Sequence, residues 1–298
     1  MNVLVLGSAG QLGQDVMAAA AAARLDTVGL THADVEVTDP ESVRAAILAA
    51  RPSAVVNCAA YVRVEECELE VTTAFAVNAA GALHVARAAA AADALCVYIS
   101  TDYVFDGEKV DSYTKDDVPS PINVYGASKL AGEVLTRQAS RRSLIVRVSS
   151  LFGHGGSRAK GGNFVDKILA QADAGRELCV PSDVHISPTY SKHAAEALVQ
   201  LLVTATTGTV HLVNSGHTTW YGLASTALRL AGFESRRITP LVSHETPSGV
   251  RRPRNSSLAT RHREGPASRL PPWEVALSEY VRERQSARST MSKASVRR

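Results

Sequence analysis

The sequence predicts an α/β protein: a doubly wound, Rossmann-type parallel sheet with a smaller C-terminal substrate-binding lobe. Short runs of Val, Ile and Leu alternate with longer Ala-rich amphipathic stretches, and a glycine-rich turn follows the first apolar run of the 298-residue chain. Apolar strands with helices between them indicate a parallel sheet covered on both faces, because each crossover helix must lie across the sheet.

The first half of the chain supplies the expected sheet. Its strands are expected at residues 3–6, 27–30, 54–57, 95–100 and 144–148. The Ala run at 18–23 continues the first crossover helix, which opens at Gln11, because alanine is the strongest helix former. We expect residues 1–152 to form the dinucleotide-binding domain, and a later strand and helix around 190–214 are candidates to join it.

Beyond residue 152 the pattern changes, because glycine and proline separate shorter apolar runs and residues 153–162 are rich in glycine. Residues 153–284 are expected to form mainly the substrate-binding lobe. Its expected elements are helices after Asn163, at 192–203, at 220–231 and from Trp273, and a strand at 209–214. The basic, Ser-rich end, residues 285–298, is expected to be a disordered tail.

Composition argues against several classes of protein. No stretch approaches the roughly 20 apolar residues of a bilayer span, and a strand pattern follows the initial methionine without a leader, so we expect a soluble cytoplasmic protein without a membrane partner. The cysteines, Cys58, Cys67, Cys96 and Cys179, are too scattered to indicate zinc or a disulfide framework, and no metal is expected. Arginines gather at 251–269, but no interleaved aromatic residues accompany them, so nucleic-acid binding is not expected.

A glycine motif lies between the first expected strand and the first expected helix. Its glycines let the backbone approach a pyrophosphate and let the helix pack on the strand, and the helix N-terminus offers unpaired N–H groups and positive dipole charge to phosphates. The residues predicted to bind the phosphates of a dinucleotide are Gly7, Ala9, Gly10, Gln11, Leu12 and Gly13.

The end of the second expected strand bears on the choice between NADPH and NADH. Thr31 and His32 stand there, without an acidic residue at the tip to hold the ribose hydroxyls of NAD. A 2′-phosphate is therefore not repelled, but no Arg stands there to bind it, so NADPH is the expected cofactor and NADH stays open. Glu36 and Asp39 are within reach of the adenine, with Val37 between them, although either acid also suits a solvated loop or a helix cap.

The run Tyr-Gly-Ala-Ser-Lys places Tyr125 and Lys129 four residues apart, on one face of a helix. An ammonium beside a phenol favours the phenolate and lowers the pKa of the Tyr from about 10, so the pair can move a proton to or from a carbonyl oxygen near neutral pH. This spacing is common by chance. With the glycine motif upstream and Thr101 at the end of a strand, we predict Thr101, Tyr125 and Lys129 as catalytic residues.

Together these motifs give the chain a family likeness: it resembles the extended short-chain dehydrogenase/reductases and, within them, the dTDP-4-dehydrorhamnose reductases. The likeness spans most of the chain, and the segment at 100–107 is its most specific part. The other segments that carry it are 7–13, 56–61, 75–78, 121–126, 162–164, 187–189, 252–256 and the helix from Trp273.

The resemblance implies NAD(P)H-dependent reduction of the 4-keto group of a dTDP-linked deoxysugar. Thr101 would hydrogen-bond the substrate oxygen, Tyr125 would donate the proton, and Lys129 would hold the nicotinamide ribose and tune Tyr125. Further residues implied at the cofactor are Ala59, Ala60, Tyr61, Asn78, Ser100 and Ser149. Those implied at the substrate are Asp102, Tyr103, Ser150, Asn163, Ser187 and Arg252, whose guanidinium fork suits a diphosphate.

Two alternatives stay open, and one departure leaves the sugar undecided. Members of the family often carry a Trp after the Arg-x-Ser segment, where this chain has Ser150, Leu151 and Phe152, so the exact ketosugar is open. Related dehydratases place Asp-Glu after the catalytic Thr, but here Asp102 precedes Tyr103, which favours ketone reduction over elimination. A nucleotide-sugar epimerase and a non-catalytic dinucleotide-binding regulatory subunit remain alternatives, and a homodimer is the candidate assembly.

Overall fold

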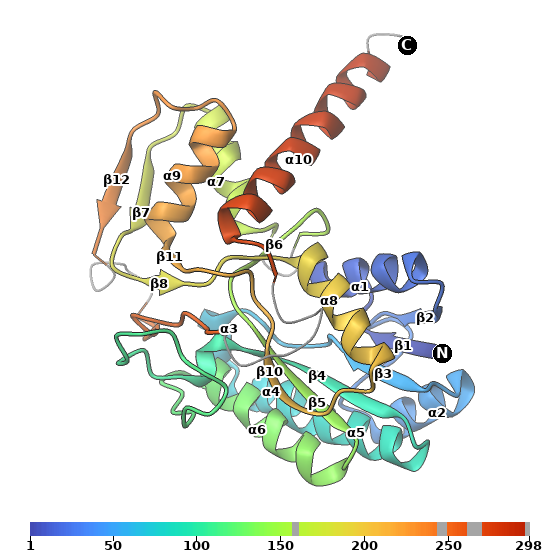
Figure 1. The fold of residues 1–298 in the computed structure, drawn as a ribbon. Helices are drawn as coiled ribbons and strands as arrows, with labels where there is room; N and C mark the ends of the chain where they lie inside the picture. The colour runs from blue at the N-terminus through green and yellow to red at the C-terminus, as the bar shows by residue number, and fades with distance from the viewer. Residues whose placement is uncertain (157–160, 243–248, 261–269, 296–298) are drawn as a thin grey trace.

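The structure is a computed structural model that describes residues 1–156, 161–242, 249–260 and 270–295, with side chains to residue 287. Its centre is a parallel sheet in the order β10-β5-β4-β3-β1-β2 (Figure 1). The strands are β1 Asn2–Leu6, β2 Asp26–Leu30, β3 Ala54–Asn57, β4 Leu95–Thr101, β5 Ser143–Val148 and β10 Gly208–His211. This arrangement confirms the predicted α/β fold with a doubly wound parallel sheet.

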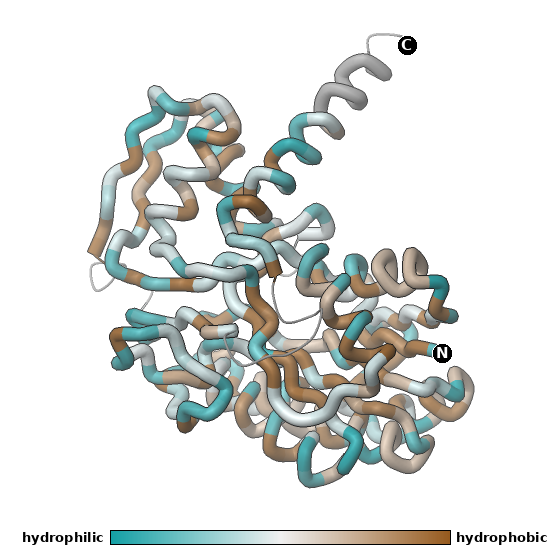
Figure 2. Tube along the Cα trace, viewed as in Figure 1, coloured by the Kyte–Doolittle hydropathy of each residue, from teal (hydrophilic) through white to brown (hydrophobic). Residues whose placement is uncertain are grey.

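Helices cover both faces of the sheet, so its central strands are buried throughout (Figure 2). Alternate residues of β1 show the two faces: Val3 and Val5 pack with α1 and α8, whereas Leu4 and Leu6 pack with α2 and α5. The helices of these two layers are α1 Gln11–Ala22 and α8 Ser191–Val203 on one face, and α2 Pro40–Ala50, α5 Gly81–Ala91 and α6 Val124–Ala139 on the other. The later strand and helix around 190–214 are therefore part of this body.

Short elements connect the carboxyl ends of the strands. Between β3 and α5 the chain forms α3 Val64–Leu69, α4 Val71–Phe75 and the π-helical turn η1 Ala76–Ala80, and after β4 it forms the 3₁₀ turn η2 Asp102–Val104. A π-helical turn holds one residue more per turn than an α-helix and is common at functional sites. Its residue Asn78 is one of the predicted cofactor neighbours.

The remaining elements form a second lobe with its own apolar cluster, which includes Phe152, Tyr190 and Tyr280 (Figure 1). Its helices are α7 Phe164–Asp173, α9 Trp220–Leu230 and α10 Trp273–Ser295. Its strand pairs are β6 Leu151–Phe152 with β9 Thr189–Tyr190, β7 Leu178–Pro181 with β12 Ile238–Leu241, and β8 His185–Ile186 with β11 Thr218–Thr219. Within the described ranges, none of the helices combines the length and apolar character of a membrane span.

The expected disordered tail at 285–298 is wrong over its described part, because α10 continues to Ser295 (Figure 1). Trp273, Leu277 and Tyr280 anchor the start of this helix in the lobe. Helix propagation then costs little, since each added residue contributes one backbone hydrogen bond and Arg, Gln, Ala, Met and Lys are good helix formers. Residues 296–298, and 261–269 of the Arg-rich segment, lie outside the described residues.

Candidate active site

The predicted site residues gather at the carboxyl edge of the sheet. β1 ends before Gly7, β4 ends at Thr101 and β5 ends before Ser149. The chain leaves β1 toward β2 on one side, whereas β3 lies on the other side of β1, so the strand order reverses at this point. In doubly wound sheets, ligands bind in the crevice outside such a switch point.

The glycine turn is packed too tightly for side chains. Gly7 has φ +74°, which favours glycine, and a Cβ added there would lie 2.9 Å from the amide nitrogen of Ala59. A Cβ on Gly13 would lie 2.4 Å from the carbonyl oxygen of Gly7. The first turn of α1 carries no acidic residue, and no side chain caps it at Gly10, so its N–H groups face the crevice edge unpaired by a cap.

Gln11 is the side chain in this turn that fits a bound phosphate group. It is 9% exposed, and its Nε2 atom is buried without a hydrogen-bond partner among the described residues. A buried donor of this kind is usually satisfied by an acceptor, which a ligand oxygen would supply. Leu12, by contrast, packs in the core beside β1. Its backbone is therefore the part that is available for the predicted contact with the cofactor. The carbonyl of Ala9 accepts from the Gln14 amide at 2.8 Å.

The end of β2 contains an acid that the sequence reasoning missed. The Asp34 carboxylate accepts from the amide and the hydroxyl of Thr31, at 2.8 and 2.7 Å. These hydrogen bonds from Thr31 lower the pKa of Asp34. His32 lies 3.4 Å from Glu36, and Val37 is buried. The spacing Thr-x-x-Asp is the signal that would have indicated this turn, and contacts of these residues with the adenosine remain predictions.

Asn78 supports the loop after β3. Its Oδ1 accepts from the amide of Tyr61 at 2.9 Å, and its Nδ2 donates to the carbonyl of Tyr61 and to the hydroxyl of Ser128, both at 3.0 Å. The side chain is fully buried and links this loop to α6. It therefore holds the loop that includes Ala59 and Ala60, and its supporting role beside the cofactor stays a prediction.

The structure brings Thr101 and Tyr125 together, although 24 positions separate them in the sequence. Asn123 caps the N-terminus of α6 by accepting from the amide of Gly126 at 2.8 Å, which places Tyr125 in the first turn. The Tyr125 and Thr101 side chains hydrogen-bond each other. The Thr101 hydroxyl donates to Asp102 at 2.9 Å, and its hydrogen bond with Tyr125 lowers the pKa of the phenol.

The pKa of Tyr125 is raised here, whereas a lowered one was predicted, and the effect of Lys129 on it stays a prediction. Burial raises the pKa of Tyr125, Thr101 lowers it by hydrogen bonding, and the charge of Asp102 raises it further. The Lys129 ammonium lies 4.1 Å from the centroid of the Tyr98 ring, where it makes a cation–π contact. Burial lowers the pKa of Lys129 from 10.5 to about 7. Lys129 thus carries a charge that costs stability and can be lost near neutral pH.

We expect Lys129→Met to stabilise the fold while it removes a predicted catalytic residue. Because the pKa of Lys129 is about 7 in the folded chain and near 10.5 when unfolded, the folded state pays the full cost of this charge below pH 7, and the cost shrinks as pH rises toward 10.5. The expected gain in the free energy of unfolding is on the order of 2 kcal/mol at pH 6 and less at pH 9.5. Urea unfolding at both pH values measures it, and a less stable variant at pH 6 would contradict this account.

Asp102 joins β4 to the residues after β5. It is 4% exposed, and its second carboxylate oxygen accepts from Ser149 at 2.8 Å. Burial raises the pKa of Asp102, and hydrogen bonds from Ser149 and Thr101 lower it. Ser150 follows with φ +45°, a strained backbone for a residue with a Cβ. Tyr103 packs edge-on against Tyr125, with ring centroids 5.9 Å apart.

Three side chains that were predicted to contact the cofactor or the substrate make hydrogen bonds within the fold. The Ser100 hydroxyl donates to Glu133 at 2.6 Å, inside the interface of β4 and α6, so it does not face the cofactor crevice. Asn163 caps α7 and donates to the carbonyl of Gly153 at 2.9 Å, and the Ser187 hydroxyl accepts from the amide of Leu258 at 3.0 Å. These hydrogen bonds hold the side chains within the fold, and their predicted ligand roles stay predictions.

Arg252 contacts Tyr103, which packs against the predicted catalytic residue Tyr125. Its guanidinium pairs with Glu65 at the start of α3 and hydrogen-bonds Tyr103. Burial raises the pKa of Tyr103 to about 12, and the Arg252 charge lowers it. Its side chain is 33% exposed. Arg252 therefore joins the second lobe to the crevice, and its contact with a diphosphate remains a prediction.

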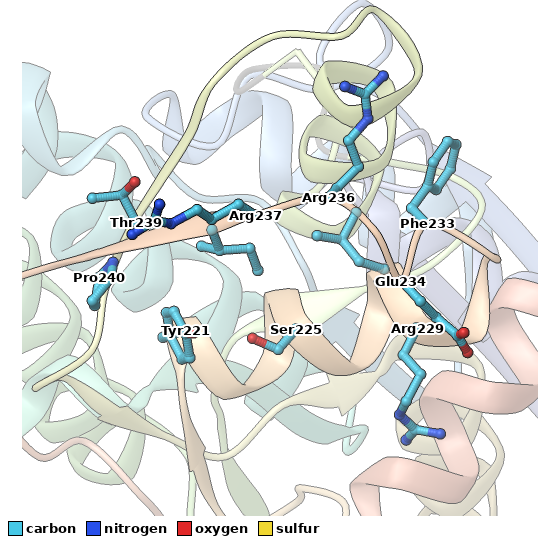
Figure 3. A pocket seen from close by; sticks show the side chains of 11 residues that line it. Tyr221, Ser225, Arg229, Phe233, Glu234, Arg236, Arg237, Thr239 and Pro240 are labelled. Carbon is cyan, nitrogen blue, oxygen red and sulfur yellow. The ribbon is translucent and has the colours of Figure 1, made fainter.

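A separate pocket of about 670 Å³ lies between α9 and β12 (Figure 3). Tyr221, Phe233 and the guanidinium groups of Arg229, Arg236 and Arg237 line part of it. None of the predicted site residues lies there, so it is distinct from the crevice. In the described part of the chain, no group of three His, Cys, Asp or Glu side chains is placed to hold a metal ion.

Comparisons with known proteins agree with this arrangement. The family model described as RmlD substrate binding domain matches residues 1–286. The spore coat polysaccharide biosynthesis protein SpsK of Bacillus subtilis is 38% identical over 96% of this chain and 99% of its own length. A dTDP-4-keto-6-deoxy-D-glucose reductase of Streptomyces niveus is 34% identical over 93% and 95%.

A solved structure is similar over the same span. The dTDP-4-dehydrorhamnose reductase of Bacillus anthracis, determined in complex with NADP, superposes with a TM-score of 0.89 at 31% identity, covering 95% of this chain and 99% of that one. The fold, the crevice and these matches lead to one conclusion. The chain belongs to the RmlD substrate binding domain family, which includes the dTDP-4-dehydrorhamnose reductases.

Proposed function

We propose that this protein is an NADPH-dependent reductase of the 4-keto group of a dTDP-linked 6-deoxysugar, in deoxysugar biosynthesis. The observation that carries the proposal is the hydrogen-bonded pair of Thr101 and Tyr125, at the carboxyl edge of the sheet that also holds the glycine turn. Relatives of 34% and 36% identity are named as reductases of such sugars.

The residues present fit a dinucleotide phosphate. The glycine turn leaves space that a Cβ would fill, Gln11 offers a buried unpaired donor, and α1 opens without an acidic residue. When bound, NADPH supplies the hydride. We assign its phosphates to the turn at Gly10 and Gln11 and its nicotinamide ribose to Lys129, in keeping with the NADP complex of the Bacillus anthracis relative.

The chain's own residues then handle the proton. Tyr125 hydrogen-bonds Thr101, and the Thr101 hydroxyl donates to Asp102. A ketone oxygen placed at this pair would take the Tyr125 proton, because the alkoxide formed by hydride addition is a far stronger base than a phenolate. The hydrogen bond with Thr101 lowers the pKa of Tyr125 and so favours the charge left on it, and Asp102 accepts from Thr101 and holds it in place.

The same set of residues favours reduction over water elimination. Elimination needs a second acid or base beside the catalytic Thr, and the residue after Asp102 is Tyr103, whose pKa burial raises to about 12. A phenol held so far from ionisation is a poor base at neutral pH. One proton donor and one hydride suffice for a ketone, and this site provides the donor.

The direct test is cofactor oxidation by the purified full chain. We expect absorbance at 340 nm to fall when NADPH is mixed with dTDP-4-keto-6-deoxyglucose or its 3,5-epimer, and more slowly with NADH. The product should be a dTDP-6-deoxyhexose with a new hydroxyl at C4, identified by mass and NMR. A cofactor that is retained and recycled without net oxidation would instead support the epimerase alternative, and binding without either reaction would support the regulatory subunit.

We also propose a cytoplasmic location and a homodimeric assembly. Cys58, Cys67, Cys96 and Cys179 form no disulfide in the described part of the chain, which suits a reducing compartment. Light scattering of the purified chain measures its mass directly, and a value near the 31.5 kDa of one chain would exclude the dimer.

A further inference from the structure

A buried polar cluster of Ser100, Glu133 and Arg147 lies between α6 and the sheet. These side chains are 2%, 0% and 3% exposed. Arg147 donates through Nε and Nη2 to the two carboxylate oxygens of Glu133, both at 2.8 Å. Ser100 donates to one of these oxygens at 2.6 Å. The two-pronged pair defines both the distance and the angle between its partners.

Stability alone is a weak reason for such a pair. Removing two charges from water offsets most of their attraction, so apolar residues of similar volume often replace a buried ion pair without loss. What the pair adds is a defined position of α6 over β5. The guanidinium of Arg147 also lies 5.1 Å from the centroid of the Phe105 ring, which holds it on its other side.

Glu133 and Ser100 are close in sequence to predicted catalytic residues. Glu133 lies one helical turn after Lys129 and two after Tyr125, so the three share one face of α6. Ser100 directly precedes Thr101 and pairs with Arg147 in the register of β4 and β5. A shift of α6 along the sheet would therefore separate Tyr125 from Thr101.

Glu133 also acts on Lys129 through its charge. The groups that face Lys129 are Glu133 from its own helix, the Cys58 thiol from the loop after β3, and the Tyr98 ring from β4. Burial lowers the pKa of Lys129, and Glu133 and Cys58 raise it. Burial opposes ionisation of Glu133, but Arg147 and Ser100 outweigh it and lower its pKa, so the carboxylate is charged at neutral pH.

We propose that the Ser100–Glu133–Arg147 cluster positions the active site. It holds α6 on β4 and β5 so that Tyr125 reaches Thr101, and Glu133 presents a negative charge to the Lys129 ammonium. Glu133 is a positioning residue, since it acts through its neighbours. The proposal rests on the proposed reductase function.

The test compares Glu133→Gln, the double variant Glu133→Met with Arg147→Met, and the control Glu279→Gln. The double variant removes Glu133 and Arg147 together, so neither is left without the other, and it keeps the test valid where Glu133→Gln fails to fold. Glu279, on α10, pairs with Lys192 and His193 of α8, away from the Ser100–Glu133–Arg147 cluster, so its variant controls for the loss of an acid elsewhere. Each protein is assayed for kcat and KM between pH 5.5 and 10, with its folding checked by circular dichroism.

The protonation of Lys129 is measured separately, by NMR of the lysine Cε carbons as a function of pH. The Lys129→Met variant identifies the Lys129 signal. We expect both Glu133 variants to lower the Lys129 titration midpoint by about one pH unit, a tenfold change in its protonated fraction. We also expect kcat to fall about 100-fold at pH 8 with a small change in KM. The alkaline limb of the kcat–pH profile should move to lower pH. The control variant should match the wild type in the Lys129 midpoint, in kcat and in the alkaline limb.

A folded double variant with wild-type kcat, an unchanged pH profile and an unchanged Lys129 midpoint would overturn the proposal. A lower kcat with an unmoved midpoint and pH limb would overturn the electrostatic part and reduce Glu133 to a structural residue. Wild-type protein that oxidises no NADPH would defeat the proposed function, and the NMR titration would still decide whether Glu133 controls the charge of Lys129.

Discussion

Replacing Tyr125 by Phe is expected to lower kcat by about 1,000-fold, with KM and NADPH affinity nearly unchanged. The phenol hydrogen-bonds Thr101, and Phe keeps the ring that packs on Tyr103 while it removes the proton. General acid catalysis by one positioned group contributes about 10²- to 10⁴-fold. Single-turnover assays with NADPH and a dTDP-4-keto-6-deoxysugar measure the chemical step.

Tyr103→Phe is the matched control, because it removes a phenol one ring away from the reacting pair. We expect its kcat to stay within a few-fold of the wild type, since the pKa of Tyr103 is about 12 and its hydroxyl faces Arg252. Equal losses in both variants, or wild-type turnover by Tyr125→Phe, would show that Tyr125 is not the proton donor.

Gly13→Ala is expected to weaken NADPH binding by at least about 100-fold and to destabilise the fold. The added methyl group would lie 2.4 Å from the carbonyl oxygen of Gly7 and 2.9 Å from the Cα of Ser8, which are backbone atoms that a rotamer change cannot clear. α1 must then move away from β1, and overpacking of this kind costs about 1–3 kcal/mol. Calorimetric titration with NADPH and thermal unfolding measure the two effects.

Gly10→Ala provides a graded comparison in the same turn. Its added Cβ meets the Gly7 carbonyl at 3.2 Å, so a small adjustment relieves the contact. We therefore expect a loss of affinity of less than about tenfold. If Gly13→Ala binds NADPH as tightly as Gly10→Ala, the glycine turn is not where the phosphates bind.

Local patterns in the sequence were sufficient for the central fold. The strands at β1 to β5 were predicted to within one residue at their ends, because β-branched runs bounded by turns and Ala-rich helices are local features. The glycine turn was placed for the same reason. Tyr125 and Lys129 were predicted to share a helix face, since their spacing of four settles that without any knowledge of the tertiary fold.

The end of the chain shows where local reasoning failed. The basic composition after residue 284 suggested disorder, yet α10 runs to Ser295 because Trp273 and Tyr280 anchor its first turns in the second lobe. The anchoring residues lie upstream of the segment that they order. Composition of the segment alone contains no information about them.

The crevice also shows how far predictions from local sequence patterns reach. Local sequence patterns were enough to predict which residues stand at the ends of the strands and which share a helix face, because backbone geometry has a short, regular period. The contact of Ser100 with Glu133 and the position of Lys129 over Tyr98 depend instead on how distant segments pack. Hydrogen-bond partners and the burial that shifts pKa values come from segments far away in the chain, and no local spacing specifies them.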